Sequence, residues 1–230
     1  MDPMAPHAAG MTLPGWLTPL AWLFVVLAAL AALAVAVDIY ARGHRQRVRA
    51  MEAVWVLSAL WLGPLTLPLY TRLGRPHSTT SPQPAGATGS LPGAAARGGL
   101  PGGAASLIAH VLGVPLVLAT GLTVAGLDLY AMILVIAVLA IALLFVFEFS
   151  VRSPRDRARA GAALLVAAVT VLAFDVGMGG WMLLLHVNEL MPAPGEVTFL
   201  FLMQIGIALG FLTGYPAVAL LLKRGSKPAV

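Results

Sequence analysis

Six apolar segments, each long enough to cross a lipid bilayer, limit what this chain can fold into. A helix needs about 20 residues to cross the roughly 30 Å hydrocarbon core. Within that core every backbone N–H and C=O must be paired inside the protein, so only helices and closed barrels can span it. The segments are residues 16–39, 54–70, 104–125, 129–149, 160–187 and 197–222. They lack the alternation typical of barrel strands, so the sequence predicts an all-α, polytopic transmembrane bundle of six helices.

The composition agrees with this class and excludes others. Of the 230 residues, 60% are hydrophobic and only 10% are charged, whereas soluble domains carry about 25% charged residues. The net charge of +5 does not indicate nucleic-acid binding, because the basic residues cluster at the ends of apolar segments and therefore act as topology signals. The expected partners are the lipid bilayer and either a second copy of the chain or a membrane partner subunit, and no nucleic acid.

No catalytic motif is present in the sequence. Cysteine is absent, which excludes disulfides, thiolate nucleophiles and cysteine-based metal sites. The chain also lacks HExxH, GxSxG and phosphate-loop patterns. We therefore expect neither an enzyme nor a cofactor.

The second apolar segment, 54–70, is interrupted by Gly63-Pro64 and Pro68. Proline removes a backbone donor and clashes with the preceding turn, so the segment is predicted either to span with a kink or to enter the membrane and turn back. Six spans place ten basic residues on one side and four on the other, whereas five spans place all 14 on one side. We favour six spans, with five spans plus one re-entrant segment as the alternative.

Basic residues favour the cytoplasmic side of a membrane. Both topologies then put the C-terminus in the cytoplasm. The Arg-rich, Ala-, Leu-, Gly- and Pro-rich composition is typical of a bacterial gene, so the expected location is the bacterial inner membrane. The predicted organisation is an N-terminal pair of apolar segments (1–73), a disordered linker (74–103) in which 13 of 30 residues are Gly or Pro, and a four-helix transmembrane core (104–230).

Asp175 is the most costly residue of the chain because it lies in the middle of the fifth apolar segment. An unpaired charge at membrane depth costs at least ~2.5–3.5 kcal/mol. One hypothesis is structural, with Asp175 hydrogen-bonded to Gln204 or His110. A second is a proton or cation path from Asp175 to the titratable His186 at the end of the same helix. A third is a copper site, because methionine and histidine suit that metal; the candidate ligands are Met182, His186 and Met191.

Two further patterns concern helix packing and interfacial charge. Gly206, Gly210 and Gly214 recur at spacings of four, which lets another helix approach closely. Asp38 with Arg42, and Glu148 with Arg152, repeat an acid-then-base order four residues apart, which suits a helix face. We interpret the Asp38–Arg42 pair as a solvated pair at the interface.

Several stretches carry a resemblance to a known family. They are VWVLSALWLGPLTLPLYTRLGRP (54–76), FEFSVRSP (147–154), FDVGMGGWM (174–182) and FLFLMQIGIALGFLTGYPAVALLLKRG (199–225). Together they resemble a bacterial integral-membrane family catalogued as domain of unknown function 4396. The resemblance implies an acidic residue at Asp175 and a recurring Gly-Trp-Met after it, which adds weight to Asp175, Trp181 and Gln204 as site or packing residues.

The chain departs from this family at one place. Many members carry a His-Cys…Cys motif at the start of the third segment, whereas here that region reads LPGGAASLIAHVLG. The resemblance therefore implies a fold and a location but no reaction. The leading functional hypothesis is a protein that moves or senses a small ion or solute through Asp175. The alternatives are a non-catalytic subunit that docks a partner through the glycines of the sixth segment, and a copper-handling protein.

Overall fold

The computed structural model describes residues 13–76, 90–152 and 160–228. Across these ranges the chain is helical and contains no β-strand, which confirms the predicted class. Six helical segments are long and apolar enough to cross a membrane. The elements are α1 (Leu17–Ala36), η1 (Val37–Ala41), α2 (Arg49–Leu62), η2 (Gly63–Leu65), α3 (Thr66–Leu69), η3 (Tyr70–Gly74), α4 (Leu91–Thr120), α5 (Asp128–Val151), α7 (Ala160–Val187) and α8 (Val197–Lys223).

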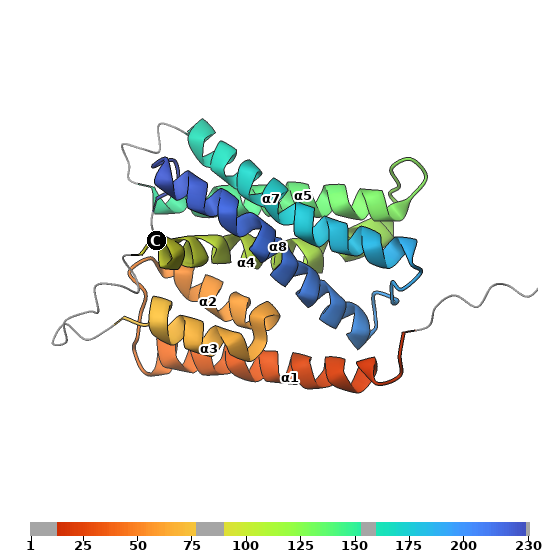
Figure 1. Ribbon diagram of the computed structural model, residues 1–230, viewed down its shortest axis with the longest axis horizontal. Helices are drawn as coiled ribbons and strands as arrows, with labels where there is room; N and C mark the ends of the chain where they lie inside the picture. The colour runs from red at the N-terminus through yellow and green to blue at the C-terminus, as the bar shows by residue number, and fades with distance from the viewer. Residues whose placement is uncertain (1–12, 77–89, 153–159, 229–230) are drawn as a thin grey trace, which may run out of the picture.

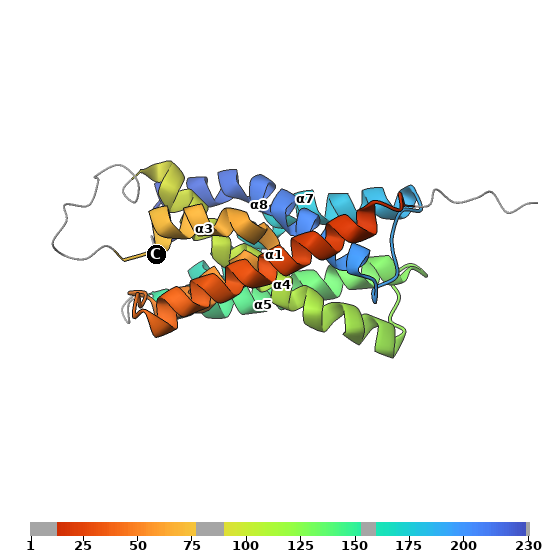
Figure 2. The same ribbon diagram turned by 90° about the horizontal axis from the view of Figure 1, so that it is seen from below.

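The long helices lie side by side in one bundle (Figure 1). Helices α4, α5, α7 and α8 pack on one another, and α1 lies along the opposite edge of the molecule, with the short segment from α2 to η3 between it and α4. Figure 2 shows α1 crossing the bundle obliquely. Large apolar side chains such as Leu23, Leu134 and Val176 remain exposed on the outer faces, as expected for surfaces that contact lipid tails.

The second apolar segment turns back on itself. Gly63 has φ +59°, a conformation that glycine adopts readily, and Pro64 follows it, so α2 ends there and α3 returns beside it (Figure 1). The rings of Trp55 and Tyr70 lie 5.4 Å apart, whereas a straight helix would separate these residues by roughly 22 Å. The segment from α2 to η3 is thus a re-entrant hairpin, which is the alternative topology that the sequence allowed, and five helices cross the bundle.

Two side-chain hydrogen bonds hold the tip of the hairpin, and one of them replaces a lost helical hydrogen bond. Pro64 has no N–H to donate to the carbonyl of Leu60. The side-chain amide of Gln204, on α8, donates to that carbonyl instead at 2.7 Å. Thr66 Oγ1 similarly donates to the carbonyl of Ser58 at 3.3 Å. The Gln204 bond therefore pairs the one carbonyl that Pro64 leaves without a donor, as the membrane interior requires.

The prediction of a disordered linker at 74–103 is wrong for the last part of that range. Helix α4 begins at Leu91, where the Ser90 hydroxyl accepts a hydrogen bond from the backbone N–H of Gly93. Four glycines of this stretch are buried in the helix: Gly98, Gly99, Gly102 and Gly103. A Cβ built on the last three would meet Phe211, Phe174 and Trp61, respectively. Small residues allow helices to approach closely, so composition alone misled the prediction here. Residues 77–89 lie outside the described ranges.

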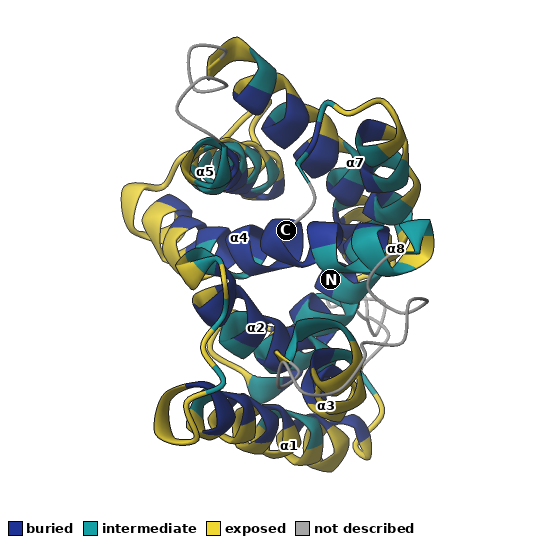
Figure 3. Ribbon diagram, turned by 90° about the vertical axis from the view of Figure 1, so that its left-hand side faces the viewer, coloured by how far each residue is buried: buried dark blue, intermediate teal, exposed yellow. Residues whose placement is uncertain are grey.

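The basic residues are concentrated at one end of the bundle. Helix α1 ends there, the hairpin enters and leaves there, α4 begins there, and α5 and α8 end there (Figure 3, viewed from this end). Every Lys and Arg of the described residues belongs to the segments at this end. We call this end the basic face.

Candidate functional site

The glycines of α8 pack against α7 of the same chain. Cβ atoms built on Gly206, Gly210 and Gly214 would meet Trp181 or Phe174 of α7. The Nε1 of Trp181 also donates a hydrogen bond to the carbonyl of Leu202 at 2.8 Å. This face is therefore already occupied within the chain, which corrects the hypothesis that a partner subunit docks on these glycines.

Asp175 lies near the middle of α7, roughly 18 Å from its end at Val187 by the helical rise. Its side chain is half-buried. Among the described residues it has neither a hydrogen-bond nor an ion-pair partner. One turn further on, a Cβ on Gly179 would meet no atom within 4 Å.

The two side chains expected to hold Asp175 bond elsewhere. Gln204 donates to the Leu60 carbonyl at the hairpin tip. His110 is buried in α4, and its Nδ1 lies 2.8 Å from the carbonyl of Ser106. That oxygen only accepts, so Nδ1 carries the proton. The hypothesis of a structural Asp175 pair with Gln204 or His110 is corrected accordingly.

The three candidate copper ligands lie in different surroundings. Met182 is buried in the hydrophobic core, Met191 packs at its edge, and His186 is exposed near the end of α7. Within the described residues, no group of three His, Cys, Asp or Glu side chains is arranged to hold a metal ion. His186 is nevertheless on the same helix as Asp175, toward the end opposite the basic face.

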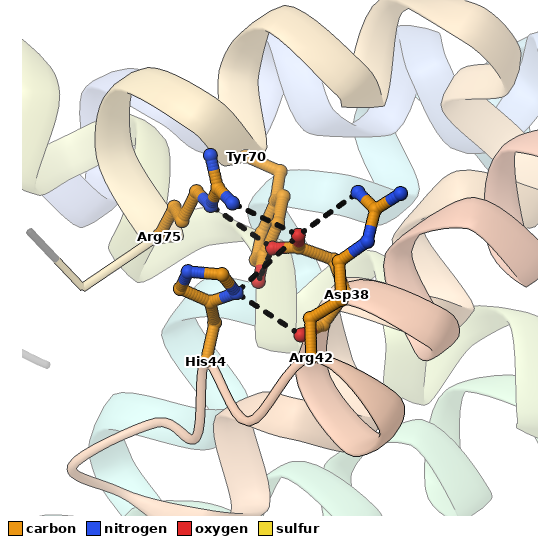
Figure 4. Close-up of polar contacts among 5 residues, drawn as sticks. All are labelled: Asp38, Arg42, His44, Tyr70 and Arg75. Atoms are coloured by element: carbon orange, nitrogen blue, oxygen red, sulfur yellow. Dashed lines mark hydrogen bonds and ion pairs between the residues drawn. The ribbon is translucent and has the colours of Figure 1, made fainter.

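The structure shows a second polar site around Asp38, for which the sequence predicts a solvated pair with Arg42. Asp38 lies in η1 and is only 7% exposed, although it sits at the interfacial end of α1. The hairpin covers it: Tyr70 of η3 and Arg75 just beyond η3 both contact its carboxylate (Figure 4). Both η1 and η3 are π-helical turns, a local widening found frequently at functional sites.

Four side chains lie against the Asp38 carboxylate, and two of them, Tyr70 and Arg75, donate hydrogen bonds to it. Tyr70 donates its hydroxyl to Oδ2 at 3.0 Å. Arg75 faces both oxygens, with Nη2 3.1 Å from Oδ1 and Nε 3.1 Å from Oδ2. His44 Nδ1 lies 3.3 Å from Oδ1, and Arg42 Nη1 lies 3.6 Å from it. This buried anion therefore fixes the end of α1 to the end of the hairpin.

Two more buried carboxylates lie at the basic face. Glu52 accepts from the backbone N–H of Gln46 at 3.2 Å and pairs with Arg45 at 3.1 Å, which shapes the loop between α1 and α2. Glu148, at the end of α5, pairs with Lys227 instead of with Arg152. Arg152 donates to the carbonyl of Ser226 at 2.8 Å.

The hairpin partners of Asp38 and the Lys227 partner of Glu148 are far from these acids in the sequence, so local spacing could not identify them. Arg45, by contrast, is only seven residues from Glu52. The available signal was the apolar context of each acid: Asp38, Glu52 and Glu148 all stand at the edge of an apolar segment. An acid in that position is costly unless a cation is supplied from elsewhere in the fold.

The comparisons with known proteins cover the four long helices after the hairpin. A family model described as domain of unknown function (DUF4396) matches residues 93–227, from the first turn of α4 to Lys227. Helix α1 and the hairpin lie outside the matched range. Neither a curated protein nor a solved structure matches the chain. With more than half of its residues in this match, the chain belongs to the family of domain of unknown function 4396.

Proposed function

We propose that this multi-pass membrane protein moves or senses a proton or another small cation by way of Asp175. The observation that supports the proposal is the isolation of this carboxylate. It lies at mid-depth in α7 with no partner among the described residues. A group kept there at a cost of at least ~2.5–3.5 kcal/mol when charged is a functional candidate by default.

The surroundings of Asp175 are consistent with exchange of a proton or ion. Gly179 lies on the same side of α7, one turn away, and a Cβ there would meet no atom within 4 Å. His186 is exposed two turns beyond, toward the end opposite the basic face, and imidazole titrates near neutral pH. The proposal is of a path from Asp175 toward His186, with no catalytic step and no cofactor.

We also propose the bacterial inner membrane as the location, with the basic face in the cytoplasm. All described Lys and Arg residues belong to segments at that face, and basic residues favour the cytoplasmic side. The C-terminal end of α8 is then cytoplasmic, whereas Leu17, where α1 begins, is on the outer side.

The decisive experiment compares Asp175→Asn with the wild type in proteoliposomes under an imposed membrane potential and pH gradient. Internal pH is followed with a trapped dye, and Na⁺ or K⁺ is exchanged for an impermeant cation in parallel. Asp175→Asn should reduce the flux at least tenfold. Asp128→Asn, which removes an exposed carboxylate from the start of α5, is the matched control and should leave the flux unchanged.

Thermal stability separates this function from a structural role. Asparagine keeps the shape of aspartate and removes the charge. Since Asp175 has no partner among the described residues, the variant should be as stable as the wild type or more stable. A wild-type flux in Asp175→Asn, or a marked loss of stability, would contradict the proposal.

A further inference from the structure

The basic face carries an excess of arginine beside the hairpin. Six Arg residues belong to the loop between α1 and α2 and to the exit of the hairpin, and the acids of this region are Asp38 and Glu52 alone among the described residues. The arginines are Arg42, Arg45, Arg47, Arg49, Arg72 and Arg75. Two carboxylates cannot neutralise six guanidinium groups, so this region keeps a local positive charge.

The Glu52 carboxylate and the backbone carbonyl of Asp38 hold the loop in one shape. The Glu52 carboxylate accepts a hydrogen bond from the backbone N–H of Gln46 and pairs with the guanidinium of Arg45. The backbone carbonyl of Asp38 accepts a hydrogen bond from the backbone N–H of His44 at 3.2 Å. These contacts fix the backbone of the loop at two points. The arginines beside those points therefore extend from a loop of defined shape.

The side chains of Arg42, Arg47 and Arg49 are exposed at the loop between α1 and α2. The side chain of Arg42 is 68% exposed and lies 3.6 Å from Asp38. Arg47 and Arg49 are exposed, and within the described residues neither has a hydrogen-bond or ion-pair partner. These three guanidinium groups are available for an external anion, and we call them the arginine patch.

The patch lies at the level where α1 leaves its apolar surroundings. Leu33 of α1 and Val37 of η1 are exposed just before it. Tyr40 is half-exposed at the same level, and the guanidinium of Arg45 lies 4.9 Å from its ring centroid. Tyrosine is enriched at the boundary between the membrane and water, so this level corresponds to the lipid headgroups.

From this geometry we infer that the arginine patch binds the phosphate groups of anionic phospholipids in the adjacent leaflet. Guanidinium presents a planar fork of donors that matches phosphate oxygens in a bidentate manner. The neighbouring apolar surface of α1 favours a phosphate attached to acyl chains over a free ion, because the chains cover that surface. The binding is independent of Asp175 and of the proposed ion path, which lie in α7.

The test uses the full-length protein in detergent, with lipids titrated in and bound lipid counted by native mass spectrometry. The lipids are phosphatidylglycerol and the zwitterionic phosphatidylcholine, and inorganic phosphate is a separate arm. The variant is Arg47→Gln/Arg49→Gln. The control is Lys223→Gln/Arg224→Gln, which removes the same charge from exposed residues of the same face at the end of α8.

We expect phosphatidylglycerol to bind the wild type and the control variant in preference to phosphatidylcholine. Each basic residue near an anionic surface contributes a substantial attraction, so the Arg47→Gln/Arg49→Gln variant should bind phosphatidylglycerol about tenfold more weakly or worse. Inorganic phosphate should not compete at millimolar concentration. Equal loss in both variants, equal binding of the two lipids, or displacement by inorganic phosphate would each overturn the inference.

Discussion

The side-chain amide of Gln204 donates a hydrogen bond of 2.7 Å to the carbonyl of Leu60, the carbonyl that Pro64 deprives of its helical partner. This contact joins α8 to the tip of the re-entrant hairpin. It gives Gln204 a structural role and leaves Asp175 without its expected partner.

Replacing Gln204 with methionine should destabilise the protein by about 1–3 kcal/mol, because the Leu60 carbonyl would be left buried without a donor. Thermal unfolding in detergent measures this effect. Leu200→Met, at an exposed position of the same helix, is the control and should change little. A variant Gln204→Met as stable as the wild type would mean that the hairpin tip finds another donor.

The re-entrant hairpin predicts that residues 47 and 76 lie on the same side of the membrane. The chain contains no cysteine, so single cysteines can be introduced at Arg47, Pro76 and Thr123, all exposed. An impermeant thiol reagent applied to oriented vesicles should label Arg47→Cys and Pro76→Cys from one side and Thr123→Cys from the other. Labelling of positions 47 and 76 from opposite sides would show that the second segment crosses.

Removing the charge of Asp38 or of Arg75 should loosen the contact between α1 and the hairpin. Asp38→Asn and Arg75→Gln each leave a charge without its partner, so each should cost about 1–3 kcal/mol. In a double-mutant cycle the two should be strongly non-additive. Arg42→Gln is the control, because its more exposed and longer contact should contribute within ~1 kcal/mol. Additive effects of Asp38→Asn and Arg75→Gln would refute the pairing.

Two glycines of α7 should respond in opposite ways to alanine. A Cβ at Gly177 would lie 2.5 Å from the backbone oxygen of Leu209 on α8, whereas a Cβ at Gly179 would meet nothing within 4 Å. Gly177→Ala should therefore destabilise the protein by about 1–3 kcal/mol through overpacking. Gly179→Ala should be neutral or stabilising by up to ~1 kcal/mol, because alanine favours the helix. Thermal unfolding of both variants provides the comparison, and equal effects would exclude tight packing at Gly177.

The buried Lys227 predicts a pH dependence of stability. Burial lowers the pKa of Lys227 to about 7, from 10.5 for an ordinary lysine. Above pH 7 the unfolded chain then binds more protons than the folded one at this site, so the stability contributed by Lys227 rises with pH from about 7 to 10.5. The reference is the double variant Glu148→Leu/Lys227→Met, which lacks both members of the pair. The difference in free energy of unfolding between wild type and variant should grow with pH across this window. A constant or falling difference would mean that Lys227 keeps its proton in the folded state.

The amino-acid sequence alone determined the class of this protein and most of its helix positions. Apolar segments of membrane length leave the backbone few options in lipid, which is why residues 160–187 and 197–222 were identified to within a residue of α7 and α8. The family resemblance was likewise carried by local motifs, and the family match supports it.

Only the tertiary structure decided where the polar residues meet. Tyr70 and Arg75 reach Asp38 because the chain reverses at Gly63, and Lys227 reaches Glu148 because α8 ends beside α5. Such contacts join residues distant in the chain, and spacing patterns report neighbours on one helix only. The glycine-rich start of α4 illustrates the same limit: whether a glycine loosens a loop or admits a packed neighbour depends on the helices that surround it.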